Sequence, residues 1–202
     1  MHEQARDFTV FVASTFPSSF YGKTVLDVGS GDINGNNAFL FNQCIYVGND
    51  VYHAPNVTIV SKTSALPYPA NIFDTIISTE CFEHDPEYEL SFKKIVEMLK
   101  PGGLFAFTCA STDRSEHGTR RTSPGDSFGT IGKVEGWMDY YKNLTTEDLD
   151  SAINIDSVFS SYASYYNSGS KDLYFWGIKA GGQSASAPIY SAANTHLVRS
   201  KN

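Results

Sequence analysis

Long apolar runs are absent from this 202-residue chain. The most apolar stretch near its start, from Phe8 to Phe16, is short and is interrupted by Thr9, Ser14 and Thr15. It has neither the basic flank nor the small-residue cleavage site of a secretory signal. We therefore expect no signal peptide, no membrane span and no membrane partner.

Positive charge is also scarce. Lysine and arginine together number 15 against 22 acidic residues, which gives a formal net charge of -7. A long polyanion would be repelled by such a chain, so we expect no nucleic-acid partner. The one basic cluster consists of Arg114, Arg120 and Arg121.

Cysteine is rare, with only Cys44, Cys81 and Cys109, and three thiols cannot all pair within one chain. Each lies in an apolar context typical of a reduced, buried thiol, which favours a cytoplasmic location. Apolar residues, by contrast, make up 41% of the chain, enough for one substantial core but few for two. We expect a single domain over residues 1–180, as a monomer or a homodimer.

Strand and helix patterns alternate along this domain. Apolar spacing predicts an N-terminal helix within residues 1–20 and further helices over 36–42, 85–99 and 145–153. Strands are predicted over 24–28, 45–48, 57–60, 72–78 and 104–109, followed by an antiparallel hairpin of 157–167 with 171–180. The fold class is therefore α/β, a three-layer sandwich with a mostly parallel sheet and helices on both faces.

Two segments lack any such period. Residues 110–136 are polar and glycine-rich, and they are long for a connection within a domain, so we interpret them as a candidate acceptor loop. Residues 181–202 are rich in Ser, Ala and Gly, and we predict that they form a flexible tail.

A glycine-containing turn follows the first predicted strand, at the sheet edge where α/β proteins bind ligands. Gly29-Ser30-Gly31 leaves room for a ligand, but it is not the dinucleotide motif because Asn34 stands where that motif needs glycine. Asp27 precedes the turn, and its carboxylate would repel a pyrophosphate but attract the ammonium group of an amino acid. The turn therefore favours a ligand with an amino-acid end over NAD.

Asp50 ends the second predicted strand, where a carboxylate can accept hydrogen bonds from both hydroxyls of a ribose. On its own, Asp50 would be interpreted as an exposed loop residue. Together with the glycine turn, its position favours a ribose ligand.

Six motifs in order resemble those of the class I, type-11-like S-adenosylmethionine-dependent methyltransferases. They lie between about residues 22 and 110 and are Leu26-Asp27-Val28-Gly29-Ser30-Gly31, Val47-Gly48-Asn49-Asp50, Leu66-Pro67-Tyr68, Phe73-Asp74, Glu80-Cys81-Phe82-Glu83-His84 and Leu99-Lys100-Pro101-Gly102-Gly103. The resemblance implies a seven-stranded sheet with one antiparallel strand and S-adenosylmethionine as cofactor, released as S-adenosylhomocysteine. It also implies that Asp27 and the glycine turn hold the methionine end, Asp50 the ribose and residues 62–65 the adenine. The cofactor site predicted in this way comprises Asp27, Gly29, Ser30, Gly31, Asn34, Asp50, Val51, Lys62, Thr63, Ser64, Ala65 and Glu80.

Two positions depart from the family pattern. Lys62 stands where many relatives carry an acid for the adenine amino group, and a lysine cannot accept that hydrogen bond. Either the backbone or the hydroxyls of Thr63 and Ser64 hold the adenine instead, or Lys62 points outward. Isoleucine occupies position 33, where a closer motif has glycine, and Asn34 is the residue that could contact the carboxylate end instead.

Methyl transfer to a hydroxyl needs an aligned acceptor and a base. The candidate catalytic residues are His84, for which a structural or cofactor-side role is the favoured alternative, and His117, which lies in the candidate acceptor loop. That loop is either a solvated polar segment or a lid. The predicted acceptor-binding residues are Arg114, Arg120, Arg121, Trp137, Tyr140 and Tyr141, the aromatic ones having core packing as their alternative role.

Three functions are compatible with these patterns. The first is a methyltransferase acting on a small molecule, for which we consider a sugar or sugar nucleotide. The second is a non-catalytic nucleoside-binding member of the fold that acts through a protein partner, and the third, an NAD-linked oxidoreductase, is disfavoured by Asp27 and the missing glycine. A metal site could be built from His84, Asp85 and His117, but their spacing matches no recognised ligand set, so no metal is predicted.

Overall fold

A computed structural model describes residues 1–183 and 185–202, and Ser184, which falls in the predicted tail, lies outside the described residues. The strands are β1 (Thr24–Val28), β2 (Ile45–Asp50), β3 (Ile59–Val60), β4 (Phe73–Thr79), β5 (Leu99–Ala110), β6 (Phe159–Asn167), β7 (Asp172–Lys179) and β8 (Thr195–Lys201). The α-helices are α1 (Glu3–Thr15), α2 (Tyr88–Met98), α3 (Phe128–Ile131), α4 (Thr146–Ile153) and α5 (Ile155–Val158). Short 3-10 turns include η2 (Ala38–Leu40), η3 (Thr63–Ala65), η4 (Phe82–His84) and η5 (Pro124–Asp126).

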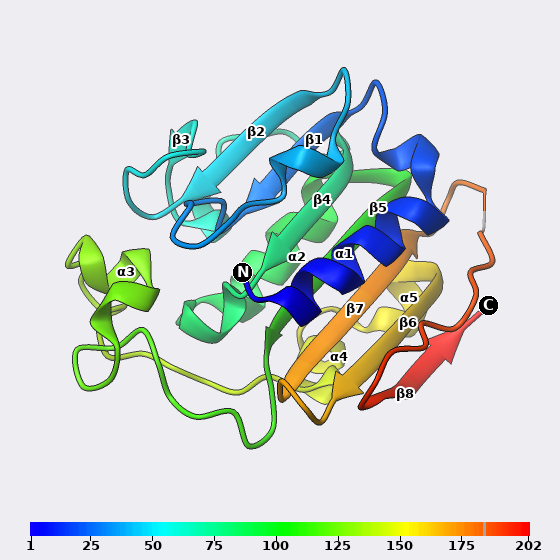
Figure 1. Cartoon of the computed structure of the whole chain (residues 1–202). Coiled ribbons are helices and arrows are strands. Elements are labelled where there is room, and N and C mark those ends of the chain that lie inside the picture. The colour runs from blue at the N-terminus through cyan, green and yellow to red at the C-terminus, as the bar shows by residue number, and fades with distance from the viewer. Residues whose placement is uncertain (184) are drawn as a thin grey trace.

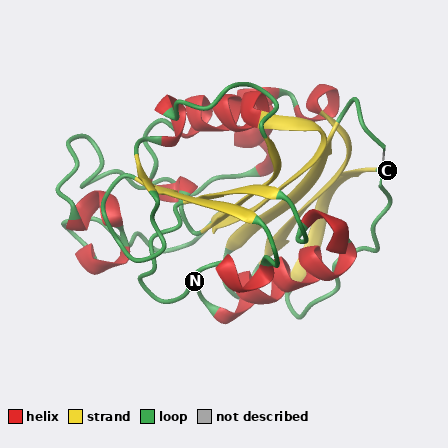
Figure 2. Cartoon of the chain, turned by 90° about the horizontal axis from the view of Figure 1, so that it is seen from above, coloured by secondary structure: helices red, strands yellow, loops and turns green. Residues whose placement is uncertain are grey.

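All eight strands form one sheet in the order β3-β2-β1-β4-β5-β7-β6-β8. The pairs among the first five strands of this order are parallel, whereas β7 and β8 are antiparallel to their neighbours. Helix α1 lies on one face and α2, α4 and α5 on the other (Figure 1), so that helices flank the sheet on both sides (Figure 2). The predicted α/β sandwich and its terminal hairpin are therefore confirmed, with eight strands in place of seven.

Two apolar cores lie on opposite faces of the sheet. Beneath α1, the Phe8 ring stacks on Tyr174 with ring centroids 4.9 Å apart. On the other face, Phe92 of α2 packs against Phe82 and Phe107, which belong to the larger cluster. The sequences of the central strands are nearly continuous apolar runs because both faces of these strands are buried.

The predicted helix over 36–42 is wrong, because only the turn η2 forms there. Polar side chains satisfy the backbone locally instead: the Asp32 carboxylate accepts from the Gly35 amide, and the Asn36 side-chain oxygen accepts from the Ala38 amide. Such local bonds compete with helix formation.

Several predicted boundaries also shift. Strand β3 has two residues instead of four, and β5 begins at Leu99 instead of Leu104. Helix α2 begins at Tyr88, because the Asp85 carboxylate accepts from the Glu87 amide and the Ser91 hydroxyl and so closes a turn before the helix.

The prediction of a flexible tail is wrong for its last part. Residues 195–201 form β8, which pairs with the outer edge of β6. Arg199 of β8 forms ion pairs with Asp150 and Asp156. Upstream of this strand, Tyr190 is buried against the ring of Phe8.

Candidate functional site

A cavity of about 210 Å³ opens at the carboxyl ends of β1, β2 and β4. The loop after β1, the end of β2 and the first residues after β4 contribute its walls, and the segment around α3 lies over the same edge of the sheet (Figure 1). Its lining includes eight of the twelve residues predicted to bind a cofactor, namely Asp27, Gly29, Ser30, Gly31, Asn34, Asp50, Val51 and Glu80.

The glycine turn lies against two neighbouring segments. Gly29 has a φ of +68°, and a Cβ there would lie 2.4 Å from the Cys81 sulfur. A Cβ on Gly31 would lie 2.3 Å from the ring of Phe128. The turn is held by Asn56, whose side-chain nitrogen donates to the Ser30 carbonyl at 3.0 Å. Glycine is therefore required for close packing here as well as for access to the cavity.

Asp27 contributes a buried carboxylate to the cavity floor, with only 1% of the residue exposed. Its oxygens accept from the Tyr46 hydroxyl and from the Asn37 side chain. Burial raises the pKa of Asp27 to about 7, although these two hydrogen bonds oppose the rise. The carboxyl group therefore changes charge near neutral pH, where a cationic ligand would favour its ionised form.

Asp50 contributes a second carboxylate at the end of β2. It accepts from the Gly31 amide at 3.1 Å and from the Val51 amide at 2.7 Å, which fixes its orientation beside the glycine turn. Burial raises the pKa of Asp50 to about 6 against the effect of these amides. Two carboxylates therefore lie on either side of one glycine turn, as the sequence predicted.

The segment predicted to contact adenine lies outside this lining. Lys62 and Ser64 are both bonded to Glu87, each at 2.5 Å, and the Thr63 hydroxyl donates to the Asn49 side chain. Lys62 and Ser64 are therefore turned toward the start of α2 and Thr63 toward β2, and Lys62 does point outward, with 45% of its side chain exposed. The sequence could not show this, because Glu87 is remote in the chain.

Both candidate bases lie at the cavity. The rings of His84 and His117 are perpendicular, with centroids 5.0 Å apart, and Tyr141 packs against both. Burial and the neighbouring His117 lower the pKa of His84 to about 3, so that its imidazole is neutral at physiological pH. The Nε2 atoms of both histidines are 4.0 Å from the carboxylate of Glu83, which the sequence analysis placed in a family motif without a catalytic or binding role.

The candidate acceptor loop over 110–136 is folded against the cavity. Arg114 and Trp137 line the cavity, but the Arg114 guanidinium already contacts Asp172 and the Ser170 carbonyl. Arg120 and Arg121 lie outside the lining and are exposed, and they pair with Asp139, just after the loop, and with Glu116 within it. Tyr140 also lies outside the lining and is only partly buried.

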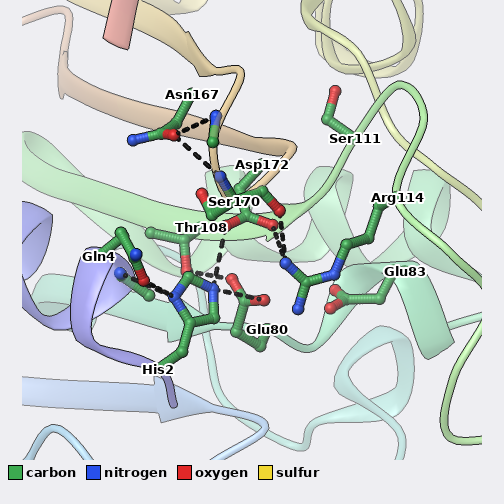
Figure 3. Close-up of polar contacts among 12 residues, drawn as sticks. His2, Gln4, Glu80, Glu83, Thr108, Ser111, Arg114, Asn167, Ser170 and Asp172 are labelled. Carbon is green, nitrogen blue, oxygen red and sulfur yellow. Dashed lines mark hydrogen bonds and ion pairs between the residues drawn. The ribbon is translucent and has the colours of Figure 1, made fainter. Parts of the chain in front are cut away.

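The sequence also gave no indication of a buried ion network beside Glu80 (Figure 3). Nε2 of His2 is 2.9 Å from the Asp172 carboxylate and 3.3 Å from that of Glu80. The hydrogen bonds to these two acids raise the pKa of His2 to about 10 against the opposing effect of burial. Both oxygens of the Glu80 carboxylate already have partners, the Thr108 hydroxyl and His2, so that less of their hydrogen-bonding capacity is left for a cofactor.

Within the described residues, we find no helix with the length and apolarity needed to cross a bilayer.

The chain is similar in sequence to known methyltransferases. The model of a family described as a methyltransferase domain matches residues 1–143. Among curated proteins, sterol 24-C-methyltransferase of Pneumocystis carinii is 32% identical over 103 residues, which cover 42% of this chain and 27% of that protein. The chain thus matches about a quarter of the length of this relative.

Solved structures share the fold at low sequence identity. The 1,6-didemethyltoxoflavin-N1-methyltransferase of Burkholderia thailandensis, solved with 1,6-didemethyltoxoflavin and S-adenosylhomocysteine, has a TM-score of 0.58 and 15% identity, covering 87% of this chain and 79% of that one. A cyclase, SpnF, has the same TM-score and identity, covering 88% of this chain and 81% of that one. At this identity the likeness shows the fold alone.

Proposed function

We propose that this chain, which belongs to the methyltransferase domain family, transfers a methyl group from S-adenosylmethionine to a small-molecule acceptor. Methyltransferases of this fold use S-adenosylmethionine as their cofactor. The observation that carries the proposal is a pair of carboxylates, the buried Asp27 and the partly buried Asp50, beside one glycine turn at a single cavity. Asp27 suits an ammonium group and Asp50 suits the hydroxyls of a ribose. Both groups occur in this cofactor.

The remaining walls suggest where each part of the cofactor binds. We assign the methionine end to Asp27 and the glycine turn, and the ribose to Asp50. Adenine is assigned to the wall formed by Val51 and Phe128, because Thr63 and Ser64 are already bonded to Asn49 and Glu87. When bound, the cofactor supplies an electrophilic methyl group.

The acceptor would bind at the part of the cavity lined by His84, His117 and Trp137. This wall combines imidazole nitrogens with an aromatic face, a combination that suits a hydroxyl-bearing ring such as a sugar or sugar nucleotide. The pKa of His84, lowered to about 3, keeps its imidazole neutral but makes it a weak base, so we assign the removal of the hydroxyl proton to His117 and a positioning role to His84. The similar proteins do not identify the acceptor, because the molecules in their names and structures differ. One is named a sterol methyltransferase, and another was solved with 1,6-didemethyltoxoflavin.

We keep a second function because SpnF, a cyclase by its name, has the same fold, so that the fold is not confined to methyltransferases. In this alternative the chain binds a nucleoside ligand without transferring a methyl group and acts through a protein partner. It shares the cofactor cavity with the first proposal, so that cofactor binding alone does not separate the two.

Isothermal titration with S-adenosylmethionine, S-adenosylhomocysteine and NAD tests the shared part of both proposals. We expect the first two to bind and NAD not to bind. Incubation with S-adenosylmethionine and a library of sugars, sugar nucleotides and other small acceptors, followed by mass detection of products 14 Da heavier, separates catalysis from binding. Absence of cofactor binding overturns both functions, whereas binding without any methylated product favours the second.

A further inference from the structure

Three metal-ligand side chains meet beside the cavity. Two of them, His84 and His117, line it and are used by the proposed function, whereas the third, Glu83, is fully buried and has no role there. Glu83 and His84 are neighbours on η4, whereas His117 comes from the candidate acceptor loop. Glu83 Oε1 is 4.0 Å from Nε2 of both histidines, and one ligand atom from each residue lies within 4.8 Å of the others. Two imidazoles and one carboxylate form a common ligand set for divalent transition metals.

The carboxylate of Glu83 has no partner that would account for its burial. The residue is 0% exposed, and within the described part of the chain neither of its carboxylate oxygens has a hydrogen-bond partner. The nearby Arg114 is bonded instead to Asp172 and Ser170 (Figure 3). A buried carboxyl group with no partner stays protonated, because its ionisation there costs several kcal/mol by an order-of-magnitude estimate, whereas a coordinated metal ion stabilises the ionised form.

His117 is already oriented for coordination. Nδ1 of His117 lies 3.1 Å from the Ser115 carbonyl and can donate to it, which leaves the lone pair on Nε2, the atom that faces Glu83. Metal-binding histidines are commonly held by such a bond from the other ring nitrogen to a carbonyl. Gly118 lets the loop lie directly on His84, since a Cβ there would be 2.5 Å from the His84 ring.

We propose that Glu83, His84 and His117 bind a divalent transition-metal ion, of the zinc or iron(II) type, at the wall of the cavity. Ligand distances of about 2.0–2.2 Å require the three side chains to approach one another by a fraction of an ångström. Three protein ligands leave coordination positions open on the cavity side. On the premise of the proposed function, an acceptor hydroxyl binds at an open position, where the metal lowers its pKa, and its proton passes to solvent because the metal then holds the lone pairs of both histidines.

The second group of ligand-type side chains, His2 with Glu80 and Asp172, does not offer the same site. His2 lies within 3.3 Å of both acids, and its raised pKa means that the imidazole is protonated and has no free lone pair. This group is an ion network in which the positive charge of His2 takes the place of a metal. It supplies a matched negative control for a binding experiment.

The test is a titration of chelator-treated protein with Co²⁺, followed by visible d–d absorption, and with Zn²⁺, followed by calorimetry. We expect one equivalent of either ion to bind. His117→Ala, a change at a partly exposed loop residue, should weaken binding at least tenfold, and Glu83→Gln should do the same. His2→Ala, and His53→Ala at an exposed histidine, should leave the affinity unchanged.

Failure of the wild-type protein to bind either ion overturns the inference, as does binding that His117→Ala leaves unchanged or that His2→Ala abolishes. Circular dichroism of each variant separates loss of a ligand from loss of the fold. Titration of the metal-free protein with S-adenosylmethionine distinguishes the two proposals: cofactor binding without metal binding removes this inference only, and metal binding without cofactor binding removes the proposed function only.

Discussion

Asp27 is the residue whose charge should control cofactor affinity. Its pKa is raised to about 7, so the carboxyl group ionises between about pH 6 and pH 8, and binding of an ammonium group requires the ionised form. We expect S-adenosylmethionine to bind more tightly as the pH rises through this range. Asp27→Asn should weaken binding about tenfold or more and remove most of the pH dependence, as measured by calorimetry at pH 6, 7 and 8.

Glu147→Gln, a change of an exposed acid on α4, is the matched control and should behave as the wild type. Equal affinity of Asp27→Asn and the wild type at pH 8 would contradict the role assigned to Asp27.

His2 makes a pH-dependent contribution to stability through Asp172 and Glu80. Its pKa is about 10 in the folded protein against an ordinary value of 6.5, so the stabilisation is fully present below about pH 6.5 and is lost as the pH rises to about 10. His2→Ala should lower the free energy of unfolding by about 1–3 kcal/mol at neutral pH, less than for a fully buried pair because a quarter of the side chain is exposed. Urea unfolding at pH 7 and pH 10 measures the effect, and a deficit that persists undiminished at pH 10 would argue against this ion network.

At the scale of elements, the glycine turn after β1 and the segment around α3 are packed together. A Cβ at Gly31 would meet Phe128 at 2.3 Å and the Asp50 carboxylate at 2.8 Å, so one methyl group affects both walls of the cavity. We expect Gly31→Ala to weaken S-adenosylmethionine binding at least tenfold and to reduce stability by about 1–3 kcal/mol. Gly125→Ala, at a position with open space around it, should change neither quantity in the same calorimetric and urea measurements.

Strand β8 protects the edge of β6. Removal of residues 195–202 would leave the β6 backbone unpaired on that side and would break the ion pairs of Arg199 with Asp150 and Asp156. Exposed strand edges promote association between chains. We expect the truncated protein to melt at lower temperature and to show larger species in light scattering, and a monodisperse truncated protein with unchanged melting would show that the edge needs no cover.

At the scale of the whole molecule, ligand binding should raise the stability of the fold, because the cavity is assembled from β1, β2, β4 and the segment around α3. At a concentration one hundred times its dissociation constant, S-adenosylmethionine should add about 2.7 kcal/mol. For a chain of this size that corresponds to a rise in melting temperature of roughly 5–10 °C in scanning calorimetry. NAD at the same concentration should produce no rise, and a rise of equal size with NAD would contradict the proposed specificity.

Local sequence patterns predicted most of the fold and the part of the site that is formed by the glycine turn, Asp27 and Asp50. The alternation of apolar segments predicted the parallel sheet and the terminal hairpin because burial on both faces leaves a periodic trace in the sequence. Boundaries were less accurate where polar side chains replaced backbone bonds, as Asp32 and Asn36 do in the segment predicted as a helix. Strand β8 was missed because pairing with β6 is a contact between distant residues, which composition does not reveal.

The sequence by itself determined the glycine turn, Asp27 and Asp50, because each follows or ends a predicted strand and parallel strands place their carboxyl ends at one edge. Only the tertiary structure decided the partners of the other polar groups. In the folded protein, Ser64 is bonded to Glu87, Arg114 is bonded to Asp172, and His117 lies beside Glu83. Each of these pairs joins segments that are far apart in the chain. A side chain's type and position are written in the sequence, but its partner depends on which distant segment the packing of the sheet and its loops places beside it.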